Sequence, residues 1–481
     1  MVYCIIVLSL ISAIYGSPTR QQQSSSDIHS KDLSSHEERG LADLGISRIR
    51  RRSLEKRGVR IAFKQAVAFA PATPDIVTDN VLQLEPVSGT PLSQKYLQLI
   101  EDDRIYKDEK EPAKNAEVIQ NIRDTVYLTT MKFGPEEFKL VIDTGSADTW
   151  LVQTGFKCIS MLTRQSVASA TCRFSRTYNN TKTFKAVANQ HFNISYADGE
   201  FLNGEMGRED VTFGGITVPN QEFGLINYAA WNGDTISSGL TGLAFPSVTR
   251  AYPGADAKGD KRGGNVPYDP IFTSMWKKKL ISPYFSIALN RASEGPGAVA
   301  LGGLPGGSIK FEDKWAKAPM QHLMMALPGA KTPADYQLYV VETEGWSITS
   351  PAGVSAPAVN STKVKVVLDT GTTLSYLPPA VANAINAAFD PPASQDLLMR
   401  QFIVNCNAKA PKVAMKLGGQ MVWFDGEDLK LRTGAGNTCM SGIQASRSAL
   451  QPSILGGVFL KNVVAVFDIG AAEMRFANRI R

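Results

Sequence analysis

The sequence predicts an all-β fold made of two similar, β-rich lobes with an active-site cleft between them. Two observations predict this fold. A ten-residue segment occurs twice, at 141–150 and 367–376, and each copy is followed by an apolar segment that contains glycine. Strand-like runs rich in β-branched and aromatic residues recur elsewhere, for example at 126–131 and 184–196. A duplicated unit of short strands indicates two homologous lobes related by a pseudo-two-fold axis.

Composition supports a globular protein and excludes several classes. The chain has 481 residues, of which 43% are hydrophobic and 20% are charged, so a sizeable core is available and a mostly disordered chain is excluded. The net charge of +6 is mild and its dense basic cluster lies near the N-terminus, so we expect no nucleic-acid partner. Four histidines and five cysteines occur without Cys-x-x-Cys or His-Glu-x-x-His spacing, so we expect no metal and no cofactor.

Residues 1–16 are apolar and end at a small-residue site, which is typical of a secretory signal peptide, although the basic start of such a peptide is missing. A buried N-terminal strand or a membrane anchor is the alternative, and the short length disfavours the anchor. The C-terminus lacks the hydrophobic tail of a lipid-anchor signal. We therefore expect a secreted, extracellular product without a membrane anchor, with delivery to a vacuole as the alternative.

Four cysteines remain once Cys4 leaves with residues 1–16, and an even number in a secreted chain indicates disulfides. Three pairings are open, and the sequence-local pairing joins Cys158 to Cys172 and Cys406 to Cys439. Candidate N-glycosylation sites, each in an Asn-x-Ser/Thr triplet, are Asn179, Asn193 and Asn360.

The duplicated segment carries the chemistry. The first copy contains Asp143-Thr144-Gly145-Ser146 and the second Asp369-Thr370-Gly371-Thr372, with Trp150 and Tyr376 seven positions after the respective aspartates. The later apolar segments place Gly242 99 residues after Asp143 and Gly456 87 residues after Asp369. A lone Asp-Thr-Gly is most often an ordinary turn, whereas two copies in matching context indicate a shared site.

If the two loops meet across the axis, Asp143 and Asp369 face each other. Two unit charges about 3 Å apart at an effective dielectric constant of about 20 repel by roughly 5 to 6 kcal/mol, so one carboxyl stays protonated. The pair then shares one proton. Its carboxylate can take a proton from a water that attacks a carbonyl group, while its carboxylic acid donates to the carbonyl oxygen. Such a pair hydrolyses an amide and works best in acid.

The neighbouring residues have expected supporting roles. Gly145 and Gly371 allow a tight backbone turn beside each carboxylate. Thr144 and Thr370 are expected to hydrogen-bond across the axis. The hydroxyls of Ser146 and Thr372 are expected to donate to the outer carboxylate oxygens.

From about residue 112 to the C-terminus, the sequence resembles the pepsin-like aspartic endopeptidases, and in particular their fungal secreted members. The resemblance rests on both Asp-Thr-Gly loops, both apolar-Gly segments and Ile194-Ser195-Tyr196-Ala197-Asp198-Gly199, which is similar to the flap hairpin of the family. Aspartic proteases are the established example of two aspartates that share a proton.

The resemblance implies further assignments. It makes Tyr196, Asp198 and Gly199 flap residues that contact substrate, with Trp150 hydrogen-bonded to Tyr196. On its own, Tyr196 would be read as a half-buried strand residue. The local disulfide pairing also matches the family. Ala147 stands where the family often has a second serine, so a supporting hydrogen bond is expected to change.

The expected organisation is a signal peptide at 1–16, a propeptide at 17–110 of open boundary, and N- and C-terminal catalytic lobes at 111–305 and 306–481. Within the propeptide, Lys56-Arg57 resembles a site for a kexin-like processing protease, with a solvated loop as the alternative. Residues 251–265 are polar and rich in glycine and lysine, and we expect a surface insertion there.

The function predicted from this resemblance is that of a monomeric, secreted acid endopeptidase that cleaves polypeptide substrates and binds pepstatin-type inhibitors. It should prefer large apolar residues at the cleavage site, and the acidic Asp198 and Glu200 suggest that lysine is accepted as well. The sequence disfavours two other functional classes. A catalytically dead relative is disfavoured because both aspartates and Tyr196 are present, and a two-carboxylate glycosidase does not explain the duplicated loop.

Overall fold

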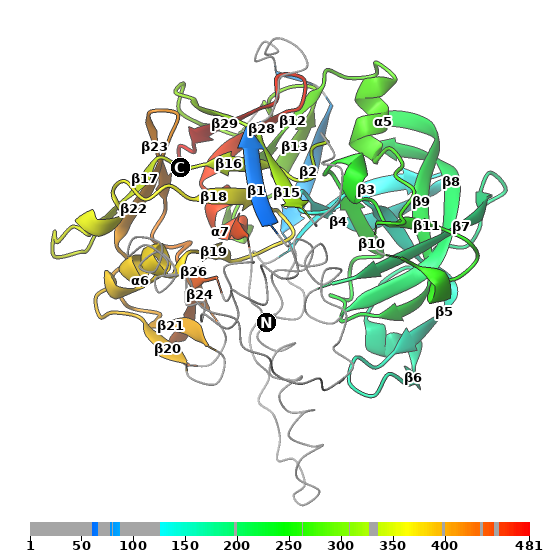
Figure 1. Cartoon of the computed structure of the whole chain (residues 1–481), viewed down its shortest axis with the longest axis horizontal. Coiled ribbons are helices and arrows are strands. Elements are labelled where there is room, and N and C mark those ends of the chain that lie inside the picture. The colour runs from blue at the N-terminus through cyan, green and yellow to red at the C-terminus, as the bar shows by residue number, and fades with distance from the viewer. Residues whose placement is uncertain are drawn as a thin grey trace, which may run out of the picture.

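This computed structural model describes residues 60–65, 77–78, 80–86 and 126–481, apart from 197–199, 262, 307, 327–334, 397–399, 433–435 and 447–451. The described residues form many β-strands and few short helices, arranged as two lobes beneath a common sheet (Figure 1). The predicted all-β, two-lobed fold is confirmed. Several predicted features lie outside the described residues: the signal peptide at 1–16, the Lys56-Arg57 site, Asp198 and Gly199.

The N-terminal lobe is one twisted sheet whose long strands bury alternate side chains. In β3 (Tyr127–Phe133), Met131 and Phe133 are buried while Thr130 and Lys132 are exposed, as expected for a strand with one face on the core. The other strands are β4 (Glu136–Asp143), β5 (Thr149–Ile159), β6 (Ser166–Val167), β7 (Lys185–Ser195), β8 (Phe201–Phe213), β9 (Ile216–Ala230), β10 (Gly239–Gly242) and β11 (Ala251–Pro253). The helix α5 (Ile271–Lys277) packs near β9.

A second set of strands joins the lobes. Its hydrogen-bonded order is β2 (Val81–Pro86), β13 (Gly297–Leu301), β12 (Tyr284–Ala288), β28 (Val463–Asp468), β29 (Glu473–Asn478) and β14 (Ala316–Pro319), and β2 also pairs with β3. All residues of β12, β13 and β28 are buried, which explains their continuous apolar sequences. The expected lobe boundary at 305/306 therefore falls beside a sheet that both lobes share. Separately, β1 (Arg60–Gln65) pairs with β15 (Gln321–Ala326).

The described residues of the C-terminal lobe form three small sheets and two α-helices. The sheets contain β16 (Val340–Glu342), β18 (Lys365–Leu368), β27 (Ser453–Leu455), β19 (Ser375–Leu377) and β26 (Ile443–Ala445); β17 (Gly345–Thr349), β22 (Lys412–Leu417) and β23 (Gln420–Phe424); and β20 (Ser394–Asp396), β21 (Gln401–Asn405), β25 (Thr438–Ser441) and β24 (Lys430–Arg432). The helices are α6 (Pro379–Ala387) and α7 (Gly457–Leu460).

The duplication seen in the sequence is also present in the strand pairing. The strand β4 ends at Asp143 and pairs in parallel with β10, so that Leu240 lies opposite Val141. The strand β18 ends one residue before Asp369 and pairs in parallel with β27, so that Leu455 lies opposite Leu368. Each apolar segment found downstream of an Asp-Thr-Gly loop is therefore the strand beside it.

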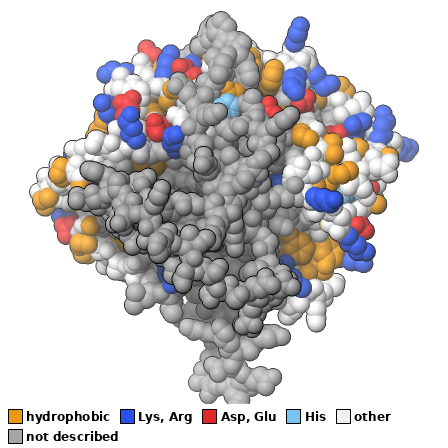
Figure 2. Space-filling view, viewed as in Figure 1, with side chains coloured by type: hydrophobic (Ala, Val, Ile, Leu, Met, Phe, Trp, Pro, Cys, Tyr) orange, Lys and Arg blue, Asp and Glu red, His pale blue; other side chains and the backbone are white. Residues whose placement is uncertain are grey.

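One cluster of buried apolar side chains runs through both lobes, and a smaller cluster lies beneath β5, β7 and β8. Two disulfides are formed, Cys158–Cys172 and Cys406–Cys439, with Cα atoms 5.8 and 5.0 Å apart. On the face in Figure 2, Lys and Arg side chains are scattered among acidic and apolar ones over both lobes. No helix within the described ranges is long and apolar enough to cross a bilayer.

Candidate active site

The two Asp-Thr-Gly loops meet at the centre of the molecule and are locked together by their threonines. The Thr144 hydroxyl donates to Leu368 O at 2.9 Å and accepts from Thr370 N at 3.0 Å. The Thr370 hydroxyl donates to Ile142 O and accepts from Thr144 N, both at 3.0 Å. These four hydrogen bonds have the cross-axis arrangement that the sequence predicted for this pair. Because all four are buried, they fix one loop against the other.

Each carboxylate is held by its own loop in the same way. Gly145 N donates to Asp143 Oδ1 at 2.7 Å and Gly371 N to Asp369 Oδ1 at 2.9 Å. The Ser146 and Thr372 hydroxyls each donate to the Oδ2 atom of their aspartate at 2.6 Å. Matching donors on the two sides give the pair the symmetry that the repeated sequence implies.

The two glycines lie in turns and allow the opposite carboxylate to approach closely. A Cβ atom on Gly145 would lie 2.5 Å from Asp369 Oδ1, and one on Gly371 would lie 2.6 Å from Asp143 Oδ1. Both glycines lie in the turn that the sequence predicts, but neither has the positive φ that favours glycine, so the turn alone does not require glycine. Neither position can carry a side chain, because the opposite carboxylate occupies the space that its Cβ atom would need. The Oδ1 atoms are thus the inner oxygens of the pair.

Burial sets the charge state of the pair. Asp143 and Asp369 are 0% and 1% exposed. Burial is the largest cause that raises the pKa of both carboxyls, and the negative charge of Asp369 raises the pKa of Asp143 further. The sequence argument used repulsion alone and therefore missed the larger cause. Both causes act in the same direction and favour a pair that holds a proton.

A third acid, Asp148, is fully buried in the same loop and was missed by the sequence argument. Its Oδ1 atom accepts from Tyr268 Oη at 2.8 Å and from Arg250 N at 2.9 Å, and its Oδ2 atom has no hydrogen-bond partner among the described residues. Burial raises the pKa of Asp148 to about 6. A signal was present, because the second copy of the repeat has Leu374 at the equivalent position.

Of the expected flap residues, Tyr196 is described, and it lies between β7 and β8, whose hairpin is called the flap hairpin here. Tyr196 directly follows β7 and is 4% exposed. Within the described part of the chain, neither Tyr196 Oη nor Trp150 Nε1 makes a hydrogen bond of normal geometry. Burial is the main reason that the pKa of Tyr196 is raised well above its usual value, and the Trp150 N–H opposes this rise. Trp231, which the sequence argument missed, packs against the Trp150 and Tyr196 rings at 5.2 and 5.6 Å.

Two other predicted residues are engaged inside the fold. Glu200 is 5% exposed and its Oε1 atom accepts from Asn232 N at 2.9 Å, so it is not a solvated acid on the hairpin. Asn193 is half-buried, and its side-chain nitrogen donates to Asp260 Oδ2. The other two glycosylation candidates, Asn179 and Asn360, are exposed.

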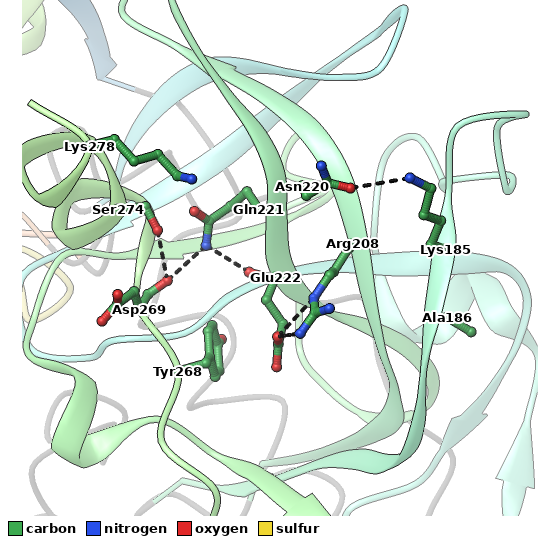
Figure 3. A pocket seen from close by; sticks show the side chains of 10 residues that line it. All are labelled: Lys185, Ala186, Arg208, Asn220, Gln221, Glu222, Tyr268, Asp269, Ser274 and Lys278. Carbon is green, nitrogen blue, oxygen red and sulfur yellow. Dashed lines mark hydrogen bonds and ion pairs between the residues drawn. The ribbon is translucent and has the colours of Figure 1, made fainter. Parts of the chain in front are cut away.

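A pocket of about 610 Å³ lies elsewhere on the N-terminal lobe, between β7, β8, β9 and α5 (Figure 3). Its carboxylates already have cationic partners, since Glu222 binds Arg208 at 2.9 Å and Asp269 binds Lys277 at 2.6 Å. No dyad residue lines it. Among the residues that the structure describes, no group of three or more His, Cys, Asp or Glu side chains could hold a metal ion. The dyad, and not this pocket, is therefore the candidate reaction centre.

Comparison with known proteins agrees with this geometry. The family model for eukaryotic aspartyl proteases matches residues 126–479. A probable aspartic-type endopeptidase of Aspergillus fumigatus is 37% identical over 415 residues, which cover 85% of this chain and 89% of the relative. Penicillopepsin-1 of Penicillium janthinellum is 27% identical over 74% of this chain and 95% of the relative. Aspergillopepsin-1 of Emericella nidulans is also 27% identical, over 74% of this chain and 78% of the relative.

Proposed function

The chain belongs to the eukaryotic aspartyl protease family and is an aspartic-type endopeptidase, and on that premise we propose that Asp143 and Asp369 are its catalytic dyad. The observation that carries the proposal is the symmetric cradle. Each carboxylate is held on its Oδ2 atom by a hydroxyl and on Oδ1 by a glycine N–H, while the threonine bonds clamp the loops together. This arrangement supports two buried acids that share one proton.

The reaction follows from that shared proton. A water bound between the inner oxygens gives a proton to the carboxylate while its oxygen attacks the peptide carbonyl carbon. The protonated carboxyl donates to the carbonyl oxygen, which produces a neutral tetrahedral diol. The C–N bond then breaks as the amine nitrogen takes a proton from one carboxyl of the dyad and a hydroxyl of the diol returns a proton to the other carboxyl. The amine and the carboxylic acid are released, and the dyad again holds one proton. Ser146 and Thr372 stabilise the remaining negative charge through the outer oxygens, because hydrogen bonds to a carboxylate favour its charged form.

The substrate is proposed to be an extended polypeptide that lies along the cleft under the flap hairpin, with large apolar residues at the cleavage site. Main-chain hydrogen bonds would hold it as an added strand and side-chain pockets would select it. Because Glu200 is engaged with Asn232, acceptance of lysine would depend on Asp198 alone. An Asp198→Ala variant that leaves the ratio of Lys to Phe cleavage unchanged would contradict that assignment.

We also propose a secreted protein that is processed after Arg57. Loss of the whole expected propeptide, 17–110, would remove β2 from between β13 and β3, where Leu84 is fully buried. Cleavage after Arg57 instead retains β1 and β2. The two disulfides support an oxidising destination, since such bonds persist in secreted proteins.

The proposal is tested by digesting a peptide library at acidic pH with the wild type and with Asp143→Asn and Asp369→Asn. We expect each amide variant to lose at least about 10³-fold of the activity, the order contributed by acid–base groups. Pepstatin should inhibit the wild type. The matched control is Asp256→Asn, the same chemical change at an exposed aspartate that contacts Lys258. Undiminished cleavage by either dyad variant would disprove the assignment.

A further inference from the structure

The expected surface insertion, 251–265, begins with the strand β11, which extends the sheet of the flap hairpin. The strand β11 pairs antiparallel with β7, so that Tyr252 lies opposite His191. Backbone bonds continue this contact on both sides: Gly254 N donates to Asn189 O at 2.8 Å, and Asn193 N donates to Arg250 O at 3.1 Å. The described residues of this segment therefore form an edge that lies against the first hairpin strand.

Asp260 links the segment to both strands of the hairpin. One of its oxygens lies 3.0 Å from His191 Nε2, and the other accepts from the Asn193 side chain. Asn193 in turn accepts from Asn203 Nδ2 at 2.7 Å, and Asn203 belongs to β8. A single carboxylate thus reaches β7 directly and β8 through one intervening amide.

His191 is placed for this contact. It is 3% exposed, and its other ring nitrogen, Nδ1, lies 3.1 Å from Gly254 O, so both nitrogens face oxygen atoms of the segment. One ring nitrogen thus lies within hydrogen-bond distance of a backbone carbonyl of the segment and the other within hydrogen-bond distance of a carboxylate. The Tyr252 ring lies nearly parallel to the imidazole, 6.0 Å away.

Both ends of the segment are anchored to the active-site loop. Asp148, five residues after Asp143, accepts from the backbone of Arg250 just before the segment. The same Asp148 oxygen accepts from Tyr268, three residues after the segment; the Tyr268 ring lines the pocket in Figure 3. The segment therefore contacts the catalytic loop at its two ends and the hairpin in its middle.

We propose that residues 251–265 act as a strut between the active-site loop and the flap hairpin, and that Asp260 is a positioning residue which holds the hairpin in place for substrate binding. The effect on substrate rests on the proposed function of the hairpin as a flap. Because Asp260 touches neither dyad carboxyl, its loss should weaken substrate binding more than it slows the chemical step.

The test compares Asp260→Ala with Asp256→Ala in the full-length protein. Asp256 lies in the same segment and contacts Lys258 within it, so the control makes the same chemical change without touching the hairpin. Hydrogen–deuterium exchange is measured in an Asp369→Asn background, which prevents self-cleavage. We expect exchange about tenfold faster in β7 and β8 for Asp260→Ala alone, as for loss of a buried charged hydrogen bond. The strut would be overturned if β7 and β8 exchanged at the same rate in Asp260→Ala as in Asp256→Ala, or if Asp260→Ala accelerated exchange throughout the lobe.

Kinetics of the active enzyme test the positioning role. Asp260→Ala should raise KM for a peptide substrate by about three- to tenfold and leave kcat within about twofold, a split that general destabilisation would not produce. Unchanged KM in a variant with a loosened hairpin would overturn the positioning role. The double variant Asp260→Ala/His191→Gln should have a KM close to that of Asp260→Ala alone. If the effects of the two substitutions on KM were additive, Asp260 would not act through His191. Hydrogen–deuterium exchange does not require catalytic activity. An inactive wild type would therefore overturn the proposed function, and the exchange result would still test the strut.

Discussion

Replacing Asp148 by Asn should change how the stability of the protein depends on pH. Burial raises the pKa of Asp148 from 3.8 to about 6. Each tenfold change in proton affinity is worth about 1.4 kcal/mol, so ionising this buried acid costs about 3 kcal/mol more in the folded protein than in the unfolded chain. Because the pKa of Asp148 is higher in the folded protein than in the unfolded chain, its contribution to the free energy of unfolding is fully present below about pH 4 and is lost as pH rises through 6.

Asp148→Asn keeps an oxygen for Tyr268 and for Arg250 N but cannot ionise. The variant should therefore become more stable relative to the wild type as pH rises from 4 to 7. For about 350 folded residues, 3 kcal/mol corresponds to a change in Tm of about 4 °C.

The measurement is thermal unfolding at pH 4, 5, 6 and 7, with both proteins carrying Asp369→Asn to prevent self-cleavage. Asp256→Asn, at an exposed site, serves as the control and should show no pH-dependent difference. The comparison cancels the contributions of every other titrating group. A Tm difference between Asp148→Asn and the wild type that stays constant across this range would refute the assignment of the pH dependence to Asp148.

Three further results are expected. Asp428→Asn should destabilise the protein by about 3 kcal/mol, because it leaves the buried Lys461, 2.9 Å away, without its counter-charge, whereas Arg291 keeps Asp425 at 2.7 Å. Urea unfolding at neutral pH measures this, and a loss below about 1 kcal/mol would contradict it. No glycan is expected on Asn193, whose amide nitrogen is bonded inside the fold, and glycopeptide mass spectrometry of the protein expressed in a eukaryotic host checks this. The mature N-terminus should follow Arg57, and an intact mass that begins beyond β2 would show that the strand is dispensable.

What the sequence could predict depends on how far apart the interacting residues lie in the chain. The bonds from Gly145 N and the Ser146 hydroxyl to Asp143 span two and three residues, so the motif itself specifies them. The contact between the two loops spans 226 residues, yet it was predictable because the motif is duplicated and the two copies mark each other. The repeat in the sequence was therefore sufficient to predict that the two loops meet at the centre of the site.

Contacts that have no counterpart in the second copy could not be predicted. Asp148 bonds to residues 102 and 120 positions away, and no repeated pattern points to Arg250 or Tyr268. The acidic Glu200 suggested an exposed role, but its partner, the backbone of Asn232, leaves no trace in the sequence. The position of β2 was missed for the same reason, since its neighbours β13 and β3 are identified only by the folded sheet.

The buried acids of the protein respond to pH in opposite directions, because Asp428 has a lowered pKa whereas Asp148 and the dyad have raised pKa values. Burial would raise the pKa of Asp428, but Lys461 and Arg291 lower it below its usual value, so the stability that this carboxylate contributes is lost as pH falls through that lowered pKa. Asp148 and the dyad have raised pKa values and lose their contribution as pH rises. The contributions of Asp428 and Asp148 are therefore both present only near the ordinary carboxyl pKa of about 4, and the contribution of Asp148 declines from there to about pH 6. The dyad acts in the same direction as Asp148, because its raised pKa values keep a proton on the pair at a pH at which ordinary carboxyls have lost theirs.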